Sequence, residues 1–169
     1  MRALFSVAVL YVAALMQMML GPQLAVYGVE PDLVFATVVA LSAVYGFLGG
    51  ALAGAGVGFY LDLLFLCPGF YSLQYILSGA VAGLVSGGGE RKSRVVQALL
   101  AGLSACFVKE LSILLSMYLE RIVFDWWAIL QKVLVGAVYT TLWTLALYFI
   151  VQLFFGKIHI KRRKAGRAI

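Results

Sequence analysis

Long stretches of apolar residues, interrupted by very few charges, constrain this chain more than any other feature. From Pro31 to Leu66 the only charged residues are Asp32, at the start, and Asp62. An apolar stretch of about 18 or more residues with few charges indicates a transmembrane helix. Over all 169 residues, 64% are hydrophobic and 12% are charged, whereas a soluble domain has about 25% charged residues. This composition excludes a soluble globular enzyme, a disordered chain and a disulfide-stapled secreted domain, and it predicts an all-α integral membrane protein.

Six apolar segments can be separated by the turn-forming and charged residues between them. They are residues 4–20, 31–45, 47–66, 70–87, 95–119 and 133–155. The second and third segments together have about 36 residues, whereas two full crossings need about 40. We therefore predict a tight hairpin that turns near Tyr45-Gly46, with one arm short or not fully crossing. All six segments form a single membrane domain, and residues 156–169 are a basic tail.

The distribution of Lys and Arg predicts that both termini are cytoplasmic. Six crossings place ten Lys and Arg residues on the side of the termini and only Arg121 and Lys132 on the other side. Cytoplasmic loops of membrane proteins carry an excess of Lys and Arg. The strongest cluster in the tail is Lys161, Arg162, Arg163 and Lys164. We interpret it as an anchor at anionic lipid, with contact to an acidic cytosolic partner as the alternative, and we expect no nucleic-acid partner.

Glycine recurs every four residues along the third segment and part of the fourth. The positions are Gly46, Gly50, Gly54 and Gly58, followed by Gly79, Gly83 and Gly87. Residues four apart lie on one face of a helix, and glycine lets another helix approach closely in a membrane, where van der Waals contact drives association. The ladder predicts either packing within this chain or docking of a partner's transmembrane helix, and both readings stay open at this point.

Three ionisable residues, Asp62, Lys109 and Glu110, fall inside the predicted spans. A charge in hydrocarbon costs several kcal/mol, so each should have a partner. At about 1.5 Å per residue, Asp62 lies about 24 Å and Lys109 about 22 Å from the cytoplasmic face. We therefore predict that Asp62 faces Lys109, or a water-filled pocket that also admits it. This pattern indicates a structural ion pair, with a ligand pocket or a partner contact as the alternatives.

No motif in the sequence indicates catalysis, a cofactor or a metal. CxxC, HExxH, GxxxxGK[ST] and GxSxG strings do not occur, and His159, the single histidine, lies in the basic tail. We interpret Cys67 and Cys106 as small hydrophobic residues without a redox role. We therefore expect no enzyme, no cofactor and no metal site. A membrane enzyme acting on lipid would need a Ser, His and Asp set or a carboxylate cluster, and neither is evident.

Three landmarks carry a resemblance to a known family. Glu30-Pro31-Asp32-Leu33 opens the second segment, the glycine ladder runs into Gly58-Phe59-Tyr60-Leu61-Asp62-Leu63-Leu64, and Pro68-Gly69 follows. In this order, with six segments and a basic C-terminal tail, they resemble the rod shape-determining protein MreD family. The matching positions are Pro31, Asp32, Gly58, Asp62, Pro68 and Gly69. We expect Pro31 and Asp32 to fix the outer start of the second helix, and Asp62 to hold the third helix against its neighbours.

The resemblance implies a non-enzymatic scaffold of the bacterial inner membrane. MreD proteins belong to the elongation machinery (the elongasome), which builds side-wall peptidoglycan and sets cell shape. They bind MreC, and the wider complex includes MreB, RodA and a class B penicillin-binding transpeptidase. The family is also similar in fold to the substrate-binding subunits of energy-coupling-factor transporters. The six-helix size and the buried charges therefore leave a second hypothesis, a substrate-binding membrane subunit of a vitamin or metal uptake transporter.

Overall fold

The computed structural model describes residues 2–25, 29–67, 69–87, 94–119 and 126–165. Within these ranges the chain is almost entirely helical and forms no β-strand. The helices are α1 (Arg2–Leu20), the 3-10 helix η1 (Pro22–Leu24), α2 (Leu33–Phe65), α3 (Phe70–Gly87), α4 (Arg94–Leu119) and α5 (Trp126–Ala165). The prediction of an all-α protein is confirmed.

Three of the described helices are long and apolar enough to cross a membrane. They are α2 (Leu33–Phe65), a stretch of α4 (Val95–Leu119) and a stretch of α5 (Ile129–Leu153). The apolar parts of α1 and α3 are shorter. These helices are compatible with the membrane protein that the sequence predicts.

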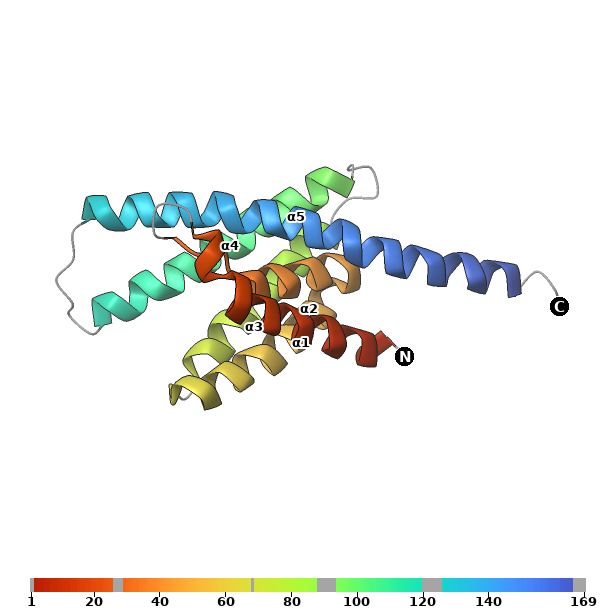
Figure 1. The fold of residues 1–169 in the computed structure, drawn as a ribbon, viewed down its shortest axis with the longest axis horizontal. Coiled ribbons are helices and arrows are strands. Elements are labelled where there is room, and N and C mark those ends of the chain that lie inside the picture. Colours follow the sequence, from red (N-terminus) through yellow and green to blue (C-terminus); the bar gives the residue numbers. More distant parts are fainter. Residues whose placement is uncertain (1, 26–28, 68, 88–93, 120–125, 166–169) are drawn as a thin grey trace.

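The first arm of α2 forms the centre of the fold. Its residues from Phe35 to Ser42 are completely buried, and α1, α3, α4 and α5 all contact α2. The main core cluster joins Phe35 and Val38 with Tyr75 of α3 and Ala101 of α4. Figure 1 shows α4 and α5 as two long helices running in opposite directions, with the start of α1 and the end of α5 at the same end of the molecule.

The chain of α2 reverses at Gly46, so the predicted turn is confirmed. Gly46 has φ 78° and ψ −169°, a conformation that is essentially restricted to glycine. In a straight helix Ser42 and Gly50 would be about 12 Å apart. A Cβ atom on Gly50 would instead lie 2.6 Å from the Ser42 hydroxyl oxygen. The two arms therefore fold back on each other as a hairpin, although the backbone stays helical on either side of the turn.

The observed boundaries correct some of the predicted ones. The fourth segment, 70–87, coincides with α3, but the second helix begins at Leu33, not Pro31, because Asp32 is its N-cap residue. α5 begins at Trp126, before the predicted sixth segment, and continues to Ala165, so most of the tail is helical. The tail residues Lys161, Arg162, Arg163 and Lys164 lie in α5, and their side chains are outside the described part.

Candidate functional site

The glycine ladder packs within the chain, along the interface between the second arm of α2 and α3. A Cβ atom on Gly54 would lie 2.6 Å from the backbone carbonyl carbon of Tyr75, and one on Gly58 would lie 2.6 Å from the carbonyl oxygen of Tyr71. Gly50 and Gly79 each face the other's backbone. Real Cβ atoms do not approach backbone this closely, so side chains at these positions would push the helices apart. The reading of the ladder as internal packing is therefore confirmed for these glycines.

The remaining glycines of the ladder have different surroundings. A Cβ atom on Gly83 of α3 would lie 2.6 Å from the carbonyl oxygen of Gly46, so Gly83 continues the interface up to the hairpin turn. Among the described residues nothing lies within 4 Å of a Cβ atom on Gly46, so its role is conformational. Gly87 is the last residue of α3. Together the ladder fixes the hairpin against α3, which in turn positions the polar residues at the other end of these helices.

Asp62 binds the N-terminus of α3, and the prediction that it faces Lys109 is wrong. Its Oδ1 accepts a hydrogen bond from the Tyr71 amide at 2.8 Å. Its Oδ2 accepts bonds from the Ser72 amide at 3.1 Å and the Ser72 hydroxyl at 2.5 Å. The first amides of a helix lack partners within the helix and favour negative charge. The start of α3 follows the end of α2 after a short connection, so its amides are close to the Asp62 carboxylate. These amides, and not a cation on another helix, are therefore the partners of Asp62.

The connection between α2 and α3 is built around the same carboxylate. Leu66, the C-cap residue of α2, has the left-handed conformation with φ 53°, and the backbone oxygen of Asp62 accepts a hydrogen bond from the Cys67 amide at 3.2 Å. Gly69 has φ 85°, which favours glycine. Pro68, the other landmark of this turn, lies outside the described residues. Asp62 and Gly69 thus act together in closing a short helix–helix connection.

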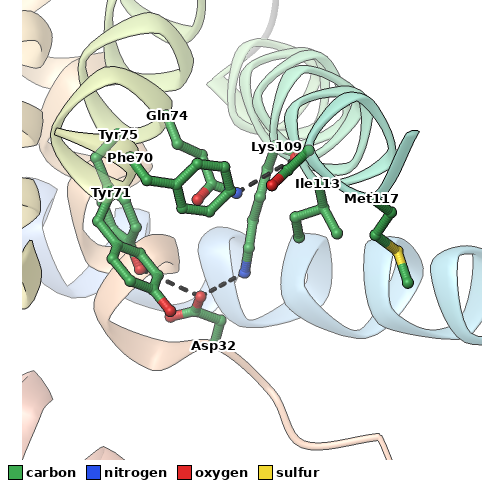
Figure 2. A pocket seen from close by; sticks show the side chains of 9 residues that line it. Asp32, Phe70, Tyr71, Gln74, Tyr75, Lys109, Ile113 and Met117 are labelled. Carbon is green, nitrogen blue, oxygen red and sulfur yellow. Dashed lines mark hydrogen bonds and ion pairs between the residues drawn. The ribbon is translucent and has the colours of Figure 1, made fainter. Parts of the chain in front are cut away.

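Asp32 joins three helices at the start of α2. Its Oδ1 accepts a hydrogen bond from the Phe35 amide at 2.9 Å, which caps α2. Its Oδ2 accepts a bond from Lys109 of α4 at 2.5 Å and from the Tyr75 hydroxyl of α3 at 3.3 Å (Figure 2). The side-chain oxygen of Gln17 in α1 accepts a hydrogen bond from the Leu33 amide at 2.6 Å, which completes the cap. The expectation that Asp32 fixes the start of this helix is confirmed, and it extends to two further helices.

Lys109 is the partner of Asp32, an arrangement that the sequence analysis missed. The two side chains are 19% and 24% exposed, respectively. The ammonium group also lies 4.8 Å from the centre of the Phe35 ring, close enough for a cation–π contact. Both ends of the α2 hairpin reach the same side of the fold, so depth in the membrane alone could not separate Asp32 from Asp62. The signal in the sequence was Asp32 itself, an acidic residue at the same expected depth as Lys109.

Glu110, the next residue on α4, forms no direct contact of this kind. Its side chain is partly buried, and it forms no hydrogen bond or ion pair with any residue that the structure describes. Neighbouring residues on a helix do not face each other, which agrees with Lys109 turning to Asp32 while Glu110 does not. Glu110 is therefore an acidic side chain near the Asp32–Lys109 pair that takes no part in the hydrogen bonds of the pair.

A pocket of about 360 Å³ opens beside the Asp32–Lys109 pair. α3 contributes Phe70, Tyr71, Gln74 and Tyr75, and α4 contributes Lys109, Ile113, Ser116 and Met117. Figure 2 shows the Lys109 side chain between the aromatic rings of α3 on one side and Ile113 and Met117 on the other. The Gln74 amide nitrogen donates to the backbone oxygen of Lys109 at 3.3 Å and ties the two walls together. The pocket thus combines one ion pair, one amide, the Ser116 hydroxyl and several flat or flexible side chains.

A metal site is not formed by the described residues, since no three His, Cys, Asp or Glu side chains among them come together. In comparisons with protein-family models, curated proteins and solved structures, nothing matches this chain. Its function is therefore argued from its own residues and geometry.

Proposed function

We propose that the protein is a non-enzymatic scaffold of the bacterial inner membrane that binds MreC within the cell-elongation complex, as the resemblance to the MreD family implies. The observation that carries the proposal is that the residues matching the MreD family hold the helices of this fold together. Asp32 caps α2 and pairs with Lys109, Asp62 and Gly69 close the connection to α3, and the glycine ladder joins the two helices. Residues that build a rigid helical framework are what a scaffold requires.

The topology proposed with this function has six crossings and cytoplasmic termini. The two arms of α2 count as separate crossings because the chain reverses at Gly46. The start of α1 and the end of α5 lie at the same end of the molecule (Figure 1), as an even number of crossings requires. The charge distribution would then place that end in the cytoplasm. As part of the same proposal, this fold is similar to that of the substrate-binding subunits of energy-coupling-factor transporters.

Much apolar surface on the helices is available for lipid or for a partner's membrane helix. On α4 the exposed side chains follow one face at intervals of four residues. They are Leu103, Phe107, Leu111 and Leu115. This face is separate from the glycine ladder, which is covered within the chain. Binding of MreC would therefore use outward-facing side chains, and glycine substitutions would affect binding only through the fold.

Co-purification tests the proposal. The tagged protein is expressed with MreC from the same genome, extracted in mild detergent and isolated, with an unrelated single-span membrane protein as the negative control. We expect MreC, and not the control, to elute with the protein at a constant ratio through size-exclusion chromatography. Recovery of a monodisperse protein that never retains MreC would refute the scaffold function.

The second candidate, a substrate-binding subunit of an uptake transporter, is favoured by the pocket between α3 and α4. Its volume of about 360 Å³ falls within the usual range for small-molecule sites, about 300–1,000 Å³. Uptake of a vitamin or metal that depends on this chain and on a partner ATPase would support this candidate over the scaffold.

A further inference from the structure

The pocket beside Lys109 has hydrogen-bonding groups that the described part of the chain leaves unused. An ammonium group has three donors, and among the described residues the only hydrogen-bond acceptor at the Lys109 Nζ is Asp32. Asp32 already accepts bonds from Lys109, Tyr75 and the Phe35 amide. A ligand that fits here should therefore present an acceptor to Lys109 and leave Asp32 in place.

Charge balance selects a neutral acceptor over an anionic one. The positive charge of Lys109 is already matched by Asp32 at 2.5 Å, and Glu110 adds an acidic group nearby on the same helix. A carboxylate or phosphate would bring a further negative charge into this partly buried pocket, where Lys109 is the one cation among the described lining residues and is already paired, which is costly. A carbonyl oxygen satisfies the ammonium group without this cost.

A second polar group faces the ligand from α3. The Gln74 side chain is 2% exposed, and its nitrogen donates to the backbone oxygen of Lys109. Its carbonyl oxygen has no hydrogen-bond partner among the described residues. An N–H donor on the ligand would pair with this oxygen. A carboxamide offers both groups, since its oxygen accepts and its nitrogen donates.

The walls of the pocket favour a flat ring. Phe70 and Tyr71 present aromatic rings from α3, with centroids 5.4 Å apart, and Ile113 and Met117 face them from α4 (Figure 2). Aromatic rings pack well against other rings at such distances, and methionine adapts to the shape of what it contacts.

We infer that this pocket binds a small, neutral, ring-bearing carboxamide or related cyclic amide, whose oxygen accepts a hydrogen bond from Lys109. The inference goes beyond the scaffold function and does not rest on it, and it deepens the second candidate by naming a ligand class. Failure of MreC to co-purify would leave the ligand site standing, and absence of ligand binding would leave the scaffold standing.

Fluorinated probes test the inference on the full chain in lipid nanodiscs. The binding of 4-fluorobenzamide and of its acidic counterpart, 4-fluorobenzoate, is titrated by ¹⁹F NMR, with empty nanodiscs as the blank. We expect saturable binding of the amide, at least about tenfold tighter than that of the benzoate, because only the benzoate adds a charge. Absence of saturable amide binding, or equal or tighter binding of the benzoate, would overturn the inference.

Two variants locate the site while keeping the ion pair. Ile113→Trp fills the pocket and should abolish amide binding, whereas Leu115→Trp is a matched control on the same helix. Leu115 is 58% exposed and does not line the pocket, so this change should leave the affinity within about twofold of the original protein. Amide binding that survives Ile113→Trp in a folded protein would place the ligand elsewhere and refute the assignment.

The variant Asp32→Asn tests the role of charge. Asparagine is as good an N-cap as aspartate, so α2 should still form. Loss of the negative charge leaves Lys109 unbalanced, and the preference should then reverse in favour of 4-fluorobenzoate. If the folded variant keeps the original preference for the amide, charge balance at Lys109 does not determine ligand choice and the argument fails.

Discussion

Adding a single methyl group at Gly54 should separate α2 from α3. A Cβ atom there would lie 2.6 Å from the backbone carbonyl carbon of Tyr75, whereas carbon atoms in contact are about 3.5–4.0 Å apart. A backbone atom cannot rotate out of the way, so the two helices must move apart by about 1 Å. A gap of about 0.5–1 Å forfeits a quarter to a half of the dispersion energy of each contact. We expect Gly54→Ala to destabilise the fold by about 3 kcal/mol, near the upper end for overpacking.

Gly56 provides the matched control two residues away on the same arm. No atom of the described residues lies within 4 Å of a Cβ atom at Gly56, so Gly56→Ala meets open space in this part of the structure. Alanine is a better helix former than glycine by about 1 kcal/mol. The same chemical change should therefore destabilise at one position and be neutral or slightly stabilising at the other.

The thermal unfolding of purified protein in detergent, followed by circular dichroism, measures both effects. For a chain of this size, about 1 kcal/mol corresponds to about 2–4 °C in Tm. Gly54→Ala should lower the Tm by about 6–12 °C, and Gly56→Ala should leave it unchanged or raise it. Equal Tm values for the two variants would show that the ladder does not hold α2 against α3, and the packing argument would be refuted.

Three further predictions concern the polar joints and the turn. Asp62→Ala removes three hydrogen bonds to the start of α3, so it should lower the Tm more than Ser72→Ala, which removes one; the reverse order would contradict the capping role. Lys109→Met leaves Asp32 without its cation and should lower the free energy of unfolding by about 3 kcal/mol, the lower end for a broken buried pair. Adding Asp32→Asn should recover part of this loss, which a double-mutant cycle measures. Strict additivity would show that the pair is uncoupled. Gly46→Ala forces a residue with a Cβ into φ 78° and should cost about 2 kcal/mol, measured by chemical unfolding; an unchanged stability would show that the turn can relax.

The sequence predicted the helical class and the hairpin turn because both depend on local patterns. Apolar length identified the helices and, because about 36 residues are too few for two full crossings, the hairpin near Gly46. The spacing of glycines then indicated the packing face along Gly50, Gly54 and Gly58. The ends of helices were harder, because Pro31 is a good first residue of a helix and Asp32 is a good cap, and only the structure shows that capping prevails.

The partners of the buried charges could not be predicted from the sequence. Depth along a helix gives one coordinate, and it is the same for Asp32 and Asp62, since the hairpin begins and ends on one side. The rotation of α4 and the position of α3 decide which carboxylate meets Lys109, and both depend on packing over the whole fold. The pocket could not be predicted for the same reason. Its walls come from α3 and α4, and the residues that line it form no sequence motif.

The two ends of the α2–α3 unit are held by different kinds of interaction, with consequences for what can move. Near Gly46 the helices touch backbone to backbone through Gly83, Gly50 and Gly79, and contacts packed this closely tolerate little added volume. At the other end the Asp32–Lys109 pair and the Gln74 hydrogen bond join α4 to α2 and α3, beside the apolar contacts of Ala101 and Ala105 in the core. Breaking the polar end, as in Lys109→Met, should therefore leave the glycine contacts of the hairpin in place, whereas Gly54→Ala separates the hairpin from α3 itself.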